Sequence, residues 1–115
     1  MVSVDPDTPL LDGPTLGRLR RLLGEAGFDS LVRDSLVAYS GYCETMLKQS
    51  NGPAAIAAEA HKLRGSAGSL GFPAISAGAG RIEAAIESGA VRADGLVQEL
   101  MRTIVATGEA LGARP

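Results

Sequence analysis

Residues 53–71, PAAIAAEAHKLRGSAGSLG, carry the pattern that decides the fold of this chain. A helix turns about 100° per residue, so positions three and four apart share a face. On that wheel one narrow arc collects apolar residues that we expect to face a core: Ile56, Ala60, Leu63, Ala67 and Leu70. The segment therefore predicts an amphipathic helix from Pro53 to Leu70.

The sequence on either side predicts four more helices, separated by glycine, proline and polar residues. We expect them at residues 13–26, 30–49, 73–88 and 93–111. Gly27 is expected to end the first of these, and Asp29 to cap the second. Connections of a few residues favour antiparallel neighbours, so the predicted fold class is all-α: an antiparallel up-down four-helix bundle with an additional N-terminal helix.

Length, charge and cysteine content exclude several classes of protein. The 115 residues suit one domain, which we place at residues 10–115 after a flexible leader at 1–9. A net charge of −2 argues against nucleic-acid binding, and no apolar run is long enough for a membrane span. One cysteine and one histidine are too few for a zinc site, and we expect a cytoplasmic protein.

His61 lies on a different face of the predicted helix, about 140° from the core arc. The stripe that contains it is otherwise made of Arg64 and small residues: Ala54, Ala57, Gly65 and Gly68. Each glycine inside a helix costs about 1 kcal/mol relative to alanine, so the two glycines need a reason. We interpret Gly65 and Gly68, with Ala57, as clearance that lets a second protein approach the imidazole.

The cation beside His61 indicates what the histidine would carry. Arg64 follows one turn later, and a guanidinium offers charge-assisted hydrogen bonds to phosphoryl oxygens. Lys62 points elsewhere on the wheel but would add positive charge near the site. A lone histidine is more often an ordinary surface or core residue, and small residues also serve helix packing. The combination on one stripe nevertheless favours a functional site.

Residues 60–71, AHKLRGSAGSLG, resemble the signature of histidine phosphotransfer (HPt) domains, in which Lys or Arg and then Gly follow the histidine. Residues 81–89, RIEAAIESG, resemble the next helix of that family, and the resemblance covers about residues 10–112. The family most often has Lys where Arg64 stands, so the charge is kept. The resemblance implies a phosphorelay carrier whose His61 accepts a phosphoryl group from a receiver-domain aspartate and passes it to another receiver domain.

The resemblance also implies a role for Glu83, because a polar residue of the next helix commonly bonds the far ring nitrogen of the histidine. The spacing supports this independently: His61 lies eleven residues before Phe72 and Glu83 eleven after it, at one level of an antiparallel pair. A carboxylate on Nδ1–H would leave Nε2 as the nucleophile. The alternative is a solvated glutamate on an amphipathic helix.

A carrier of this kind leaves the remaining chemistry to its partners. The sequence has no Gly-rich nucleotide loop, so we expect neither autokinase activity nor any other enzyme activity of its own. It has no acidic cluster, so no cofactor or metal is expected, and magnesium would belong to the partner receiver domain. The expected partners are response-regulator receiver domains, with a hybrid sensor kinase as a further candidate. We expect a monomer.

Three alternatives stay open. The phosphoacceptor part of a sensor kinase is disfavoured because Lys62 follows His61 and Gly65-Ser66 stands where such kinases have Thr-Pro. An acceptor phosphorylated directly by a kinase, as in chemotaxis kinases, would present a similar surface. A helical scaffold with an incidental His61 would keep every activity in a His61→Gln variant.

Overall fold

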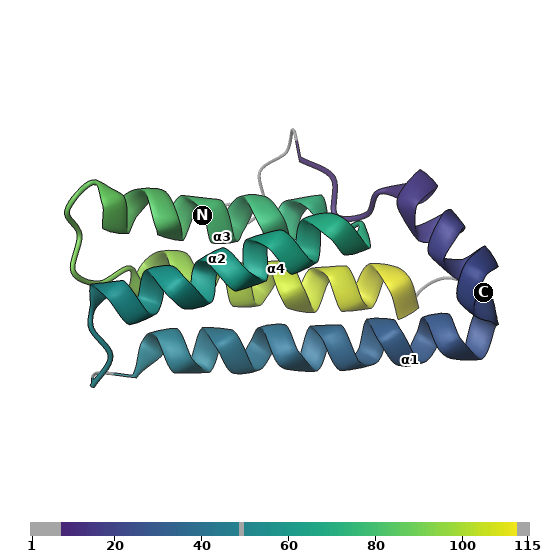
Figure 1. The fold of residues 1–115 in the computed structure, drawn as a ribbon, viewed down its shortest axis with the longest axis horizontal. Helices are drawn as coiled ribbons and strands as arrows, with labels where there is room; N and C mark the ends of the chain where they lie inside the picture. The colour runs from purple at the N-terminus through teal and green to yellow at the C-terminus, as the bar shows by residue number, and fades with distance from the viewer. Residues whose placement is uncertain (1–7, 49, 113–115) are drawn as a thin grey trace.

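The computed structural model describes residues 8–48 and 50–112 and contains four helices. They are α1 (Gly13–Leu47), α2 (Pro53–Leu70), α3 (Pro73–Glu87) and α4 (Asp94–Gly112). From the long part of α1 onward, successive helices run in alternating directions, and α4 returns to pack against α1 (Figure 1). The described residues form no strand, so the all-α prediction is confirmed. Of the predicted leader, residues 1–7 lie outside the described residues.

The additional N-terminal helix expected at residues 13–26 is not an element apart from α1: its residues are helical as far as Gly24, where the backbone leaves the helical conformation. These residues form the first part of α1, which bends at Gly24 (φ 74°, ψ 169°). The predicted break at Gly27 does not occur, and Asp29 caps nothing because helical residues continue through it. The cap of α1 is Asp12 instead.

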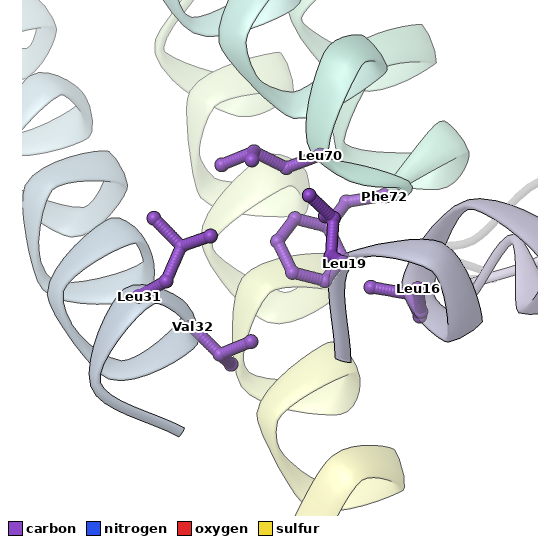
Figure 2. Close-up of a pocket in the computed structure, with 6 residues that line it drawn as sticks. All are labelled: Leu16, Leu19, Leu31, Val32, Leu70 and Phe72. Atoms are coloured by element: carbon purple, nitrogen blue, oxygen red, sulfur yellow. The ribbon is translucent and has the colours of Figure 1, made fainter. Parts of the chain in front are cut away.

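Residues 13–23, which we call the arm of α1, lie across one end of the bundle (Figure 1). Leu16 and Leu19 of the arm line a small apolar hollow with four residues of the bundle: Leu31, Val32, Leu70 and Phe72 (Figure 2). The backbone N–H of Asp12 donates to the carbonyl of Gly71 over 2.9 Å. Gly71 has φ 92°, and a Cβ there would lie 3.1 Å from Leu16 Cγ, so glycine is required at this contact. The arm thus closes this end of the core.

Arg92 fastens the opposite end of the bundle. Its guanidinium pairs with Asp94 over 2.9 Å and donates to backbone carbonyls at the end of α1 and in the following loop: Met46, Leu47, Lys48 and Asn51. The last carbonyls of a helix lack partners within the helix, and a cation favours the negative end of its dipole. Arg92 therefore joins the end of α1 to the start of α4.

The core face of α2 is the one that the sequence predicts, and the bounds of α2 match the prediction. Ile56, Ala60, Leu63 and Ala67 are buried, and Leu70 is half-buried against the core. They pack with the inner faces of the other helices, whose largest buried side chains include Phe28, Tyr39, Met46, Ile75, Ile82 and Leu100. This burial fixes the rotation of α2 and hence the direction of every outward side chain on it.

Candidate functional site

His61 projects from the outside of α2. Its side chain is 67% exposed, although Ala60 and Leu63 on the same helix are completely buried. The predicted orientation of His61, away from the core, is therefore confirmed. An imidazole this exposed can be reached by a second protein.

Glu83 on α3 holds the imidazole from one side. Its Oε2 lies 3.1 Å from His61 Nδ1, and the Glu83 side chain is only 15% exposed. An ionised carboxylate can only accept a hydrogen bond, so Nδ1–H of a neutral imidazole is the donor. Nε2 then keeps its lone pair on the solvent side, which is the tautomer a nucleophilic histidine needs.

Arg64 contacts the same carboxylate as His61. Its Nε lies 3.1 Å from Glu83 Oε1, an ion pair by distance, although the N–H does not point at this buried oxygen. Ser76 Oγ donates to the backbone carbonyl of Arg64 over 2.9 Å. The arginine stem passes over Gly80, where a Cβ would make an ordinary van der Waals contact with it, 3.5 Å from Arg64 Cδ. One carboxylate on α3 therefore orders two side chains of α2.

The sequence reasoning missed the pairing of Arg64 with Glu83. The sequence does indicate this pairing, because Arg64 follows His61 by one helical turn and lies on the same side of α2. The antiparallel level that pairs His61 with Glu83 therefore brings Arg64 within reach of the same carboxylate. The bond from Ser76 had no comparable signal in the sequence.

Lys62 is not brought to this cluster. Its Nζ pairs with Glu59 over 3.0 Å and lies 5.5 Å from the centre of the Tyr42 ring. Tyr42 belongs to α1, so Lys62 faces the α1 side of α2, whereas Glu83 approaches from the α3 side.

The small residues around His61 differ in what surrounds them. A Cβ built at Gly65 would meet no atom within 4 Å, so packing inside this molecule does not require glycine there. A Cβ at Gly68 would lie 3.3 Å from Ser76 Oγ, so contact with α3 explains part of that glycine. Ala57 is half-buried. Gly65 is thus the small residue that helix packing within the described structure leaves unexplained.

The arrangement suits a reaction with another macromolecule. A neutral imidazole with its nucleophilic nitrogen outward, a cation nearby and an open surface can take up a phosphoryl group. Among the described residues no group of three His, Cys, Asp or Glu side chains could hold a metal ion. In that same part of the chain, no helix combines the length and apolar character needed to cross a membrane.

A family model for the Hpt domain matches residues 15–110, which include most of α1 and α4 and the whole of α2 and α3. The chain belongs to the Hpt domain family. Comparison with curated proteins and with solved structures gives no significant match. Hpt domains take part in phosphotransfer in two-component phosphorelays, where they interact with receiver domains. They are phosphoryl carriers rather than kinases and carry no cofactor, so this Hpt domain is a carrier too.

Proposed function

We propose that His61 of this Hpt domain accepts a phosphoryl group from the aspartate of one receiver domain and passes it to a second receiver domain. The observation that carries the proposal is the exposed imidazole whose Nδ1 is bonded to the nearly buried Glu83 carboxylate. A histidine that served only solubility would not need a partner that fixes its tautomer.

The chemistry is a direct displacement at phosphorus. The Nε2 lone pair of His61 forms the new N–P bond while the bond from phosphorus to the aspartyl oxygen breaks, and the donor carboxylate leaves. Magnesium on the receiver domain offsets charge on the phosphoryl oxygens. Transfer to the second receiver domain reverses these steps, so no water or nucleotide enters the balance.

Glu83 offsets positive charge on the imidazole ring in this reaction, and Arg64 offsets negative charge on the phosphoryl oxygens. Once Nε2 is bonded to phosphorus and Nδ1 keeps its proton, the ring is cationic, and the Glu83 carboxylate 3.1 Å away offsets that charge. Arg64 is anchored through Nε at Glu83, and its outer guanidinium nitrogens bind phosphoryl oxygens. Lys62, outside the cluster, adds only general positive charge.

The surface around His61 admits the partner. Gly65, Gly68 and Ala57 keep the approach to Nε2 free of large side chains, so the catalytic face of a receiver domain comes within bonding distance. The partners are response-regulator receiver domains, including one attached to a hybrid sensor kinase. This role requires only a monomer, since one chain supplies His61, Glu83 and Arg64. We place the protein in the cytoplasm, and nucleic acid takes no part in the reaction.

The test is phosphoryl transfer from a panel of phosphorylated receiver domains to the wild type and to His61→Gln. We expect acid-labile, base-stable label on the wild type alone, with slower labelling of Glu83→Gln and Arg64→Ala. Circular dichroism of each variant controls for loss of the fold. Equal labelling of His61→Gln would refute the assignment. Label that came from a kinase, and from no receiver domain, would replace it with the chemotaxis-like acceptor.

A further inference from the structure

The outer surface of α4 carries an open apolar hollow of about 270 Å³. Five residues line it: Met101, Arg102, Val105, Ala106 and Glu109. Val105 in its middle is 60% exposed, the largest exposure of an apolar side chain on α4. Burial of such a side chain removes apolar surface from water, so this face gains free energy if something covers it.

The two charged residues at the edge of the hollow, Arg102 and Glu109, are both exposed. Neither forms an ion pair within the described residues. Arg102 and Glu109 are seven residues apart, which is about 10 Å along a helix axis. They are therefore too far apart to pair with each other in one molecule. Each charge is available to a partner that covers the apolar centre.

The order of these residues is self-complementary. The midpoint between Arg102 and Glu109 falls between Val105 and Ala106, at the apolar centre. When two such helices pack antiparallel about a twofold axis through that point, Arg102 of each copy faces Glu109 of the other. In the same register, Val105 of each copy meets Ala106 of the other. A twofold axis requires each residue contact to occur twice, and this pattern satisfies the requirement with opposite charges and matched apolar residues.

We propose that two copies of this chain associate through these outer faces of α4. The occupant is a second copy rather than an unrelated protein, because the order of charged and apolar residues on this surface complements itself about a twofold axis. One helix face is a small contact compared with the area that stable interfaces bury, so the dimer forms at high protein concentration and the single copy prevails when dilute.

The proposed dimer leaves the phosphotransfer site open. Within the described residues α4 packs against α1 and α3, and its backbone does not closely approach that of α2, which lies diagonally across the bundle (Figure 1). His61 on α2 therefore remains accessible in both copies. The inference does not depend on the proposed role of His61, and the two can fail separately.

The test is sedimentation velocity of the full chain from about 10 µM to about 1 mM, the range expected for a small interface. We expect the sedimentation coefficient of the wild type to rise with concentration. Arg102→Glu places like charges opposite each other twice, and we expect it to raise the dissociation constant about tenfold. The double variant Arg102→Glu with Glu109→Arg restores the opposite charges and should restore dimerisation.

Arg21→Glu is the matched control, because Arg21 is an exposed arginine of α1 and the substitution changes the net charge equally. It should dimerise like the wild type, and circular dichroism should show every variant folded. A wild type that stays monomeric at the highest concentration would overturn the proposal. So would an Arg102→Glu variant that dimerises normally, or a folded double variant that does not recover. Phosphotransfer serves as a second readout and should be equal in all four proteins.

Discussion

The two oxygens of Glu83 have different partners, and this division links the parts of the candidate site. Oε2 lies 3.1 Å from the imidazole of His61 and Oε1 lies 3.1 Å from the guanidinium of Arg64. The carboxylate is nearly buried, so its charge is less screened than that of a surface residue. A change at any one of the three residues will therefore alter the other two, and their effects on transfer should not add.

Substitutions at Gly65 test whether the surface around His61 lacks large side chains because a partner protein must approach there. Gly65→Ala should raise the free energy of unfolding by about 1 kcal/mol, because alanine favours the helix and a Cβ there meets no atom within 4 Å. Gly65→Leu should remain folded but slow transfer from a receiver domain about a hundredfold, because it displaces the approaching aspartyl phosphate. Urea unfolding and rapid-quench transfer assays measure the two effects.

A small phosphoramidate donor is the control for Gly65→Leu, since it needs no protein-sized clearance. The variant should accept phosphoryl groups from this donor at the rate of the wild type. If Gly65→Leu took phosphoryl groups from a receiver domain as fast as the wild type does, Gly65 would not be clearance.

For individual residues, the sequence predicts contacts between two helices joined by a short turn. It does not predict contacts between segments that are far apart along the chain. The level of His61 and Glu83 follows from counting outward from the turn at Phe72, and the structure has that contact. The carbonyls held by Arg92 lie more than 40 residues earlier in the chain, and no local pattern connects them.

Among the four described helices, α1 is the one for which the sequence does not predict the position of the bend. Gly24 and Gly27 lie three residues apart, and either can end a helix, so local preference does not choose between them. The choice comes from packing. Phe28 is buried and lies under the guanidinium of Arg20, 4.3 Å from the ring centre, so the two parts of α1 pack against each other across a bend at Gly24.

The bend at Gly24 makes a specific substitution costly. With φ 74° and ψ 169°, Gly24 occupies a region that residues with a side chain rarely adopt, so Gly24→Ala should lower the free energy of unfolding by about 1–3 kcal/mol. Gly41→Ala is the matched control: Gly41 is an ordinary helical residue of α1 with open space at its Cβ, and this change should stabilise by up to about 1 kcal/mol. Urea unfolding compares them, and a Gly24→Ala protein as stable as the wild type would contradict the bend.

For the whole molecule, the buried hydroxyl and thiol groups predict a loss of stability in alkali. Burial raises the pKa of the Cys43 thiol from 9.0 to about 12, and the charge of Glu44 adds to the effect. Burial also raises the pKa of Tyr39, while its hydrogen bond with Ser66 opposes the rise. Both groups therefore keep their protons in the folded state at pH values where the unfolded chain loses them.

The sign of the pH effect follows from this difference. Above pH 9.0 the unfolded state binds fewer protons than the folded state, so stability present at neutral pH is lost as the pH rises toward about 12. We expect the free energy of unfolding to fall by about 2 kcal/mol between about pH 8 and about pH 10.5. In Cys43→Ala the protein is less stable at neutral pH, but the loss over this interval should be smaller. An equally steep loss in the variant would exclude Cys43 as its source.

The α2–α3 hairpin, residues 53–87, contains every side chain assigned to the chemistry, and a turn of two residues fixes its register. The site is thus a self-contained cassette, and α1 and α4 are its scaffold. One residue inserted within α3 between Pro73 and Glu83 would rotate Glu83 about 100° relative to the preceding part of that helix and separate its carboxylate from His61.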